Sequence, residues 1–547
     1  MNLRQKLGQM IGSRSHYEEL HKLAPTGCVG AVSRHIAAEH SASLEGIIET
    51  VNDFRRMSPL PPLFFFDAEY GIFEHFRFGT AFPSMMALGA TFSESLAYRM
   101  GQVVGQEGRA IGLGMIHSPV LDINSNPDNP IINIRSLGDN PEWVFRLAGA
   151  YTRGLQESGV MANAKHFPGH GDTSGDSHAM LPVVNASRET LLGRELIPYK
   201  ELFKQGLAGI MTSHNVYPAL LGPQEPQRLQ ATFSRAIITD LLRGELGFEG
   251  LAATDGLGMH AVRNEFDAYD SAVMAIQAGH DFILSGFGEP VKTLDALEAA
   301  VRSGVISTDQ IDRSVRRLLS YKKRFGLLDS SPLNAEEAKR ILNKPEHKAV
   351  AAEISQKAVT VMENRNLPWP AGGGRKMLLI ATFSLKEKQQ LEGLGELESE
   401  GNAGSFHKKM EMYGDRIRLC IIPEQPDGED RDRVEKALSQ ENWDEVLFAT
   451  FSARPVAYGK YGGTISDEQA ALIRRIYQLY PQMTFLLMGN PYVLRLLPQF
   501  SNCLCAYSLS RVAGEAVAEV LYGQVKPEGR LPVHVNAQYP FQHGLRI

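Results

Sequence analysis

The first 330 or so residues alternate short apolar runs with amphipathic stretches, a pattern typical of repeated strands and helices. The apolar runs predict seven strands, over residues 27–33, 63–69, 115–123, 161–167, 209–216, 251–254 and 280–285. The amphipathic stretches predict helices over residues 93–111, 141–158, 188–205, 234–246 and 268–278. Strands and helices that alternate in this way pair in parallel through right-handed crossovers.

Polar side chains lie at the end of nearly every predicted strand. They are Asp67, Glu69, Asp122, Asn124, Lys165, His166, His214 and Asp255. A (β/α)8 barrel assembles its active site from such strand ends, whereas an open sheet gathers its site at one switch point, usually with a glycine-rich phosphate loop. No GxGxxG or Walker motif follows the first strand. The pattern therefore favours a TIM-type barrel of the α/β class, although periodicity does not reveal its eighth strand.

A second α/β segment follows the first. After a charged helical stretch, the breaker-rich residues 366–375 (NLPWPAGGGR) predict a linker across the surface. Beyond it, strand-like runs occupy residues 376–382, 418–422, 446–451, 483–488 and 503–507. We therefore expect a catalytic barrel over residues 1–330, a linker region over 331–375 and a smaller α/β (αβα) sandwich domain over 376–547.

Composition and charge narrow the possible partners. With 43% hydrophobic and 22% charged residues, the chain has the composition of a soluble globular protein. Its net charge of −6 argues against nucleic acid or an anionic membrane as the main partner. No secretory or membrane-spanning apolar run occurs, and the four cysteines lack disulfide or zinc spacing. We expect a cytoplasmic monomer or homodimer, or a secreted one if a leader was removed.

The richest chemistry lies in residues 165–178, which read KHFPGHGDTSGDSH and directly follow a predicted strand. A polar, glycine-rich loop buries little apolar area, so packing alone does not explain it, and we expect residues 168–175 to be a flexible run. Its imidazoles and carboxylates are metal-ligand types, but their spacing does not match a helical HExxH motif, and Lys165 would place a cation beside the metal. We expect no metal and no other cofactor.

Acid/base chemistry is the better interpretation of this loop. Asp176 and His178 are two residues apart. A carboxylate that accepts a hydrogen bond from one imidazole nitrogen fixes the tautomer and raises the basicity of the other nitrogen. Such a pair transfers protons near neutral pH, where general acid/base catalysis is most effective.

The loop resembles, position for position, the motif K-H-[FI]-P-G-[HL]-G-x4-D-[ST]-H of family 3 glycoside hydrolases, in the two-domain form of their β-N-acetylglucosaminidase branch. Other stretches agree in the same order: FPSMMALGAT (82–91), SPVLDINSNPDNPIINIRSLGDNP (118–141), MTSHNVYPAL (211–220), LLRGELGFEG (241–250), TDGLGM (254–259) and PEGRLPV (527–533). The resemblance covers nearly the whole chain and is strongest over residues 60–260.

The resemblance implies a retaining exo-β-N-acetylglucosaminidase that cleaves terminal β-linked GlcNAc from peptidoglycan fragments or chitooligosaccharides. It implies that Asp255, at the end of the sixth predicted strand, is the nucleophile, and that His178 is the general acid/base with Asp176 as its partner. A histidine then replaces the second carboxylate that most glycosidases use. The substrate-binding residues that we expect are Asp67, Arg135, Lys165, His166 and His214.

Two departures from the family pattern leave alternatives open. Tyr70 stands where the family has a glycine, and Gly256 stands where a larger or acidic residue is common. The leaving-group side of the pocket is therefore expected to differ. The alternatives are a β-N-acetylglucosaminide phosphorylase, because a histidine does not repel phosphate, a non-catalytic glycan-binding relative, and a β-glucosidase.

Overall fold

The computed structural model describes residues 1–547 except 14–16, 34–42, 75, 77, 176–180, 286–287, 329–330, 343, 384–400 and 452–464. The expected acid/base pair Asp176 and His178 therefore lies outside the described residues. The chain divides into two compact units. The first comprises Met1–Thr80, Ala97–Asn126 and Pro141–His347, and the second comprises Ala81–Leu96, Pro127–Asn140 and Lys348–Ile547.

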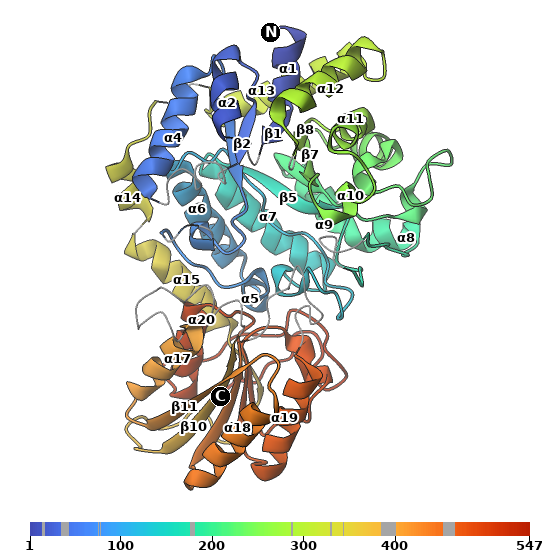
Figure 1. Ribbon diagram of the computed structural model, residues 1–547. Coiled ribbons are helices and arrows are strands. Elements are labelled where there is room, and N and C mark those ends of the chain that lie inside the picture. Colours follow the sequence, from blue (N-terminus) through green and yellow to red (C-terminus); the bar gives the residue numbers. More distant parts are fainter. Residues whose placement is uncertain are drawn as a thin grey trace. The chain divides into compact units, whose positions relative to one another are not determined.

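The first unit contains a closed barrel of eight parallel strands (Figure 1). They are β1 (Ile11–Ser13), β2 (Ala31–Ser33), β3 (Leu63–Phe66), β4 (Met115–Ile116), β5 (Met161–Phe167), β6 (Gly209–Thr212), β7 (Leu251–Gly256) and β8 (Phe282–Leu284). Pairing of β1 with both β2 and β8 closes the ring. The predicted barrel is confirmed.

The strand that periodicity does not reveal is β1. It has three residues, Ile11–Ser13, and follows the short helix α1 (Leu3–Gln9) almost directly. A run this short, ending in serine, carries no alternation from which a strand can be recognised. Because β1 precedes all the predicted strands, Asp255 lies on the seventh strand rather than the sixth.

Helices cover the outside of the barrel (Figure 1). The longer ones are α4 (Leu44–Met57), α6 (Glu94–Ala110), α7 (Pro141–Glu157), α11 (Ala268–Ala278), α12 (Pro290–Arg302) and α13 (Thr308–Arg324). In α13 the Ser307 hydroxyl accepts from the Gln310 N–H and caps the first turn. The same helix buries Ile311, Val315 and Leu318, which recur at helical spacing and face the barrel core.

The second unit has a six-stranded sheet in the order β11-β10-β12-β13-β14-β9. Its strands are β9 (Thr360–Glu363), β10 (Lys376–Phe383), β11 (Arg416–Pro423), β12 (Glu445–Thr450), β13 (Thr484–Leu487) and β14 (Asn502–Cys505). Along β10, Leu378 and Ile380 pack in one hydrophobic cluster, whereas Met377 and Leu379 pack in another. A strand buried alternately on two faces needs helices on both, as the expected sandwich requires.

The helices α17 (Gly401–Glu411) and α20 (Arg511–Leu521) contribute to one of these clusters, and α18 (Gly428–Gln440) and α19 (Asp467–Leu479) contribute to the other. Figure 1 shows the two pairs on opposite faces of the sheet. Strand β9 pairs antiparallel with β14, whereas the other neighbours in the sheet pair in parallel. Residues 331–375, predicted as a linker region, thus include a strand of this sheet.

Two short segments of the N-terminal half belong to the second unit. Helix α5 (Met85–Ala90) places Met86 in the same cluster as Ile134, which lies in the 3-10 helix η3 (Asn133–Arg135). The Arg530 N–H donates to the Ala90 carbonyl at 3.0 Å. The second unit is therefore built from three separate stretches of the chain.

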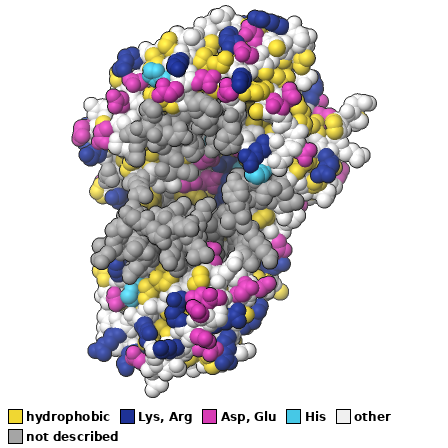
Figure 2. All heavy atoms as spheres, in the orientation of Figure 1, with side chains coloured by type: hydrophobic (Ala, Val, Ile, Leu, Met, Phe, Trp, Pro, Cys, Tyr) yellow, Lys and Arg dark blue, Asp and Glu magenta, His cyan; other side chains and the backbone are white. Residues whose placement is uncertain are grey.

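Acidic and basic side chains are interspersed on the face that Figure 2 shows. The described part of this face (Figure 2) is therefore not the single-sign surface to which nucleic acids or anionic membranes bind. Within the described ranges, no helix is long and apolar enough to span a bilayer. Cys28, Cys420, Cys503 and Cys505 are buried and not joined by disulfides.

Candidate active site

The carboxyl ends of the barrel strands bring several predicted site residues to one end of the barrel, its mouth. Asp67 directly follows β3, Lys165 and His166 lie near the end of β5, and Asp255 is the penultimate residue of β7. Every other residue of β7 is buried, whereas Asp255 is partly exposed. Its Oδ1 accepts from the Gly256 N–H at 2.6 Å. A carboxylate in this position is open to a ligand in the mouth.

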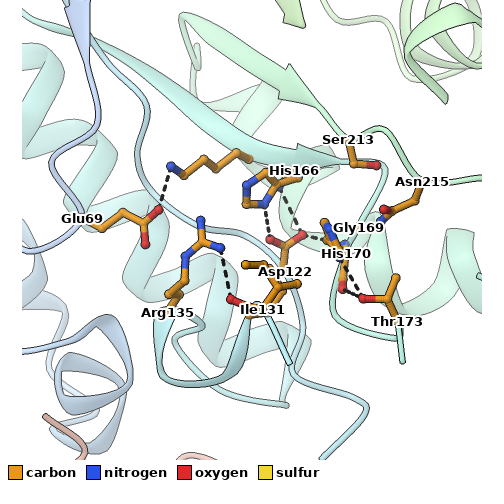
Figure 3. Close-up of polar contacts among 12 residues, drawn as sticks. Glu69, Asp122, Ile131, Arg135, His166, Gly169, His170, Thr173, Ser213 and Asn215 are labelled. Atoms are coloured by element: carbon orange, nitrogen blue, oxygen red, sulfur yellow. Dashed lines mark hydrogen bonds and ion pairs between the residues drawn. The ribbon is translucent and has the colours of Figure 1, made fainter. Parts of the chain in front are cut away.

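Lys165 connects two strand ends. Its Nζ lies 2.6 Å from Asp67 Oδ1 and 2.7 Å from Glu69 Oε1 (Figure 3 draws the contact with Glu69). The side chains of Lys165 and Glu69 are 4% and 5% exposed, whereas Asp67 is 34% exposed. The buried ammonium therefore fixes Asp67 at the mouth, where its carboxylate can bind a hydroxyl group.

His166 is held by Asp122, a fully buried residue that follows β4. His166 Nδ1 lies 2.7 Å from Asp122 Oδ2, and the His166 N–H donates to Asp122 Oδ1 at 3.2 Å (Figure 3). Burial alone would raise the pKa of Asp122. The imidazole of His166 and the donors around the carboxylate outweigh burial and hold this pKa below its ordinary value. Asp122 is therefore an ionised carboxylate at neutral pH.

Both ring nitrogens of His214 face protein atoms. Nδ1 lies 2.9 Å from Thr232 Oγ1, and Nε2 lies 3.1 Å from the Gly256 carbonyl oxygen. His214 is buried. These contacts tie the segment after β6 to Gly256, the residue next to Asp255.

Arg135 belongs to the second compact unit. It ends η3, and its Nη1 donates to the Ile131 carbonyl at 3.1 Å (Figure 3). Sugar binding by Arg135 stays a prediction from the resemblance.

Residues 168–175 of the histidine-rich loop are held in place, which corrects the expectation of a flexible run. The His170 N–H donates to Asp122 Oδ1 at 2.7 Å, and Asn126 Nδ2 donates to the Thr173 carbonyl at 3.1 Å. A Cβ on Gly171 would lie 1.6 Å from the Ile123 carbonyl oxygen, so only glycine fits there. The loop is polar, yet its polar groups have buried partners, and these partners order it.

A buried carboxyl group, that of Glu195, is linked to this loop through Arg194. Arg194 donates through Nη2 to Asp172 in the loop at 2.8 Å, and through Nε to Glu195 Oε1 at 2.6 Å. Glu195 Oε2 is buried without a hydrogen-bond partner among the described residues. Burial is the main reason that the pKa of Glu195 is raised to about 7, and the attraction of Arg194 offsets only part of it.

Replacing Glu195 with Gln should therefore change how stability depends on pH. A carboxyl whose pKa rises from 4.5 to about 7 on folding stabilises the fold fully below pH 4.5 and loses that contribution as pH rises through 7. The contribution to the free energy of unfolding that is lost between pH 4.5 and 7 is about 3 kcal/mol. We expect the free energy of unfolding of wild type, relative to Glu195→Gln, to fall over this range in urea titrations.

The exposed Glu249→Gln provides the matched control and should follow wild type throughout. Parallel curves for wild type and Glu195→Gln between pH 4.5 and 7 would contradict the raised pKa.

Glu69, Asp122 and Glu195 hold the site together but are not among the residues predicted for it. Glu69 and Asp122 are among the polar strand-end residues that favour the barrel, but the motifs assign them no role in the site. Glu195 follows the loop in a helical segment, and no sequence signal distinguishes it from a surface glutamate. In the part of the chain that the structure describes, no three His, Cys, Asp or Glu side chains are arranged to hold a metal ion.

A closed parallel barrel with a partly exposed carboxylate, a lysine–carboxylate cluster and a histidine-rich loop at its mouth defines an enzyme of the (β/α)8 class. Comparison with known families identifies it further. Residues 2–321 match the glycosyl hydrolase family 3 N-terminal domain, and residues 288–542 match the C-terminal domain of that family. The chain belongs to glycosyl hydrolase family 3 and is a glycoside hydrolase.

Similar proteins support this assignment. The solved structure of a glycoside hydrolase family 3 β-N-acetylglucosaminidase from Paenibacillus sp. str. FPU-7 is 31% identical, with a TM-score of 0.85 over 98% of this chain and 99% of that chain. β-Hexosaminidase A of Pseudoalteromonas piscicida is 28% identical over 84% of this chain and 80% of its own length. A β-N-acetylglucosaminidase/β-glucosidase of Cellulomonas fimi is 31% identical over 66% of this chain and 64% of its own length.

Proposed function

We propose that this glycoside hydrolase is a retaining exo-β-N-acetylglucosaminidase that removes terminal β-linked GlcNAc from peptidoglycan fragments or chitooligosaccharides. The observation that carries the proposal is the position of Asp255, the partly exposed residue of an otherwise buried β7, at the same end of the barrel as Lys165 and Asp67. A nucleophilic carboxylate must reach the sugar while its strand stays rigid. The name of the Paenibacillus relative supports GlcNAc as the sugar, and that of the Pseudoalteromonas relative supports a β-linked hexosamine.

In the proposed reaction, Asp255 attacks the anomeric carbon and His178 gives its proton to the departing glycosidic oxygen. The bond from carbon to that oxygen breaks as the glycosyl-enzyme ester forms. A water molecule then attacks the same carbon, His178 takes its proton, and Asp255 is released. Asp176 orients His178, as the resemblance implies.

Substrate binding is proposed for Asp67, Lys165, His166 and Arg135. Asp67 accepts from sugar hydroxyls, and Lys165 and Arg135 donate to hydroxyls or to the acetamido group. For His214 the contacts favour a different role from the expected sugar contact. It positions the end of β7 through the Gly256 carbonyl.

Product analysis tests this function. Purified protein is incubated with GlcNAc–anhydroMurNAc, chitobiose and a β-glucoside, with and without phosphate. We expect free GlcNAc, released first as the β-anomer, at a rate that phosphate does not change. The first product with inverted configuration would exclude the retaining mechanism.

The same experiment decides between the alternatives. GlcNAc-1-phosphate as the main product would establish a phosphorylase instead. A preference for the β-glucoside would replace the sugar assignment, and the double name of the Cellulomonas fimi relative makes this substrate worth including. An absence of turnover on all three substrates would favour a non-catalytic glycan-binding protein.

A further inference from the structure

Asp122 contacts two parts of the candidate site at once. It lies on the segment after β4, and its Oδ1 accepts from the main-chain N–H groups of His166 and His170 at 3.2 and 2.7 Å. Its Oδ2 lies 2.7 Å from His166 Nδ1. Figure 3 shows the carboxylate between the imidazole of His166 and the start of the loop.

These contacts determine where the His166 proton sits. A main-chain N–H only donates, so Oδ1 accepts in both of its contacts. Asp122 is ionised, because its pKa is held below the ordinary value by His166 and the donors around it despite burial. Oδ2 therefore also accepts, and His166 Nδ1 carries the proton. In the neutral imidazole, this leaves the lone pair on Nε2.

The other ring nitrogen is available to a ligand. None of the described residues hydrogen-bonds to Nε2 of His166. Because this atom is not one of the buried polar atoms that lack a partner, it retains some surface exposed to solvent. The adjacent Lys165 provides only donors. A sugar hydroxyl, which donates and accepts, needs both kinds of partner.

We propose that Asp122 is a positioning residue that fixes His166 as the Nδ1–H tautomer, so that Nε2 accepts a hydrogen bond from a hydroxyl of the bound sugar. The same carboxylate anchors the start of the loop through the His170 N–H. The sugar's identity rests on the proposed function, whereas the tautomer follows from the contacts of the protein alone.

Asp122→Asn is the decisive substitution. The Asn oxygen must stay with the two main-chain N–H groups, so the amide nitrogen faces His166 Nδ1 and can only donate. The imidazole then changes to the Nε2–H tautomer and offers the sugar a donor where an acceptor is needed. We expect kcat/KM to fall about 100-fold, because Lys165 and His166 then both donate and the proton of the sugar hydroxyl is left without an acceptor.

The tautomer itself is measured by long-range ¹H–¹⁵N spectra of protein with ¹⁵N-labelled histidine, at the alkaline plateau of a pH titration. The His166 signal is assigned by its absence in His166→Gln. We expect protonated Nδ1 and unprotonated Nε2 in wild type, and the reverse in Asp122→Asn. Protonated Nε2 in the neutral wild-type imidazole would overturn the proposal, even if Asp122→Asn does not fold.

A double-mutant cycle separates action through His166 from anchoring of the loop. Asp122→Asn should cost about 100-fold in the wild-type background but at most about threefold in His166→Gln, where no tautomer is left to change. Equal losses in both backgrounds would show that Asp122 acts through the loop, and would overturn the role assigned to His166.

Asp281→Asn is the matched control for removing a buried carboxylate. Asp281 is fully buried and paired with Arg243 and Arg317, and it precedes β8, at the end of the barrel opposite the mouth. It should lower stability while kcat/KM of the folded protein stays within about twofold. If wild type does not turn over β-GlcNAc substrates, the proposed function fails, and the NMR measurement still decides the tautomer.

Discussion

Asp255→Ala is expected to lower kcat on 4-nitrophenyl β-GlcNAc by about 10⁴-fold, because the covalent route through the glycosyl-enzyme is lost. The fold should survive. Asp255 is partly exposed at the end of β7, and it accepts a hydrogen bond from the N–H of its own neighbour Gly256. Steady-state kinetics and the thermal unfolding midpoint should therefore respond very differently to this substitution.

Azide makes the test specific for a nucleophile. Once the carboxylate is removed, azide can attack the anomeric carbon from the vacated face and give the α-glycosyl azide. We expect this product from Asp255→Ala but not from wild type. The exposed Asp270→Ala in α11 should retain wild-type kinetics and give no azide product. A wild-type rate for Asp255→Ala would contradict its role as nucleophile.

The barrel could be predicted because its signals are local. Each strand is buried, so it reads as an apolar run, and the residues after it are polar because they line the mouth. The exception shows the limit of this reasoning. Strand β1 has three residues, Ile11–Ser13, and closure of the ring depends on its pairing with β8, which is far away in the sequence.

The segments of the chain that form the second unit could not be predicted in the same way. Residues 81–96 and 127–140 lie between elements of the barrel in the sequence, yet they pack with the C-terminal sheet. Met86 and Ile134 are as apolar as barrel residues, and their apolar character does not reveal which core they enter. Only the tertiary contacts do.

The candidate site was predicted as residue types but not as a set of contacts. Asp67 follows β3 and Lys165 lies near the end of β5, and because these strands are not neighbours in the barrel, the 2.6 Å contact is not deducible from strand order. The loop illustrates the opposite error. Glycine and polar residues predicted flexibility, whereas His170 and Thr173 are buried with partners. Composition describes what a free loop would do and omits the partners that order it.

Lys165→Met is expected to lower both activity and stability, because it removes the ammonium that pairs with Glu69 and Asp67. Removing one partner of a buried ion pair costs about 3–5 kcal/mol, since the remaining charge stays buried and uncompensated. The exposed Lys292→Met, which breaks a surface pair with Glu289, should cost less than about 1 kcal/mol. Urea unfolding measures the stability lost in each of the two variants.

The double variant Lys165→Met/Glu69→Gln separates the two roles of Lys165. Glu69 is 5% exposed, so neutralising it removes most of the uncompensated charge and should recover more than half of the lost stability. Activity should stay at least about 100-fold below wild type, because the donor to the sugar is still missing. Recovery of activity together with stability would mean that Lys165 only supports the fold. Loss of activity in a stable protein would mean that the Lys165 ammonium contacts the substrate at the end of the barrel, where Asp67 and His166 also lie.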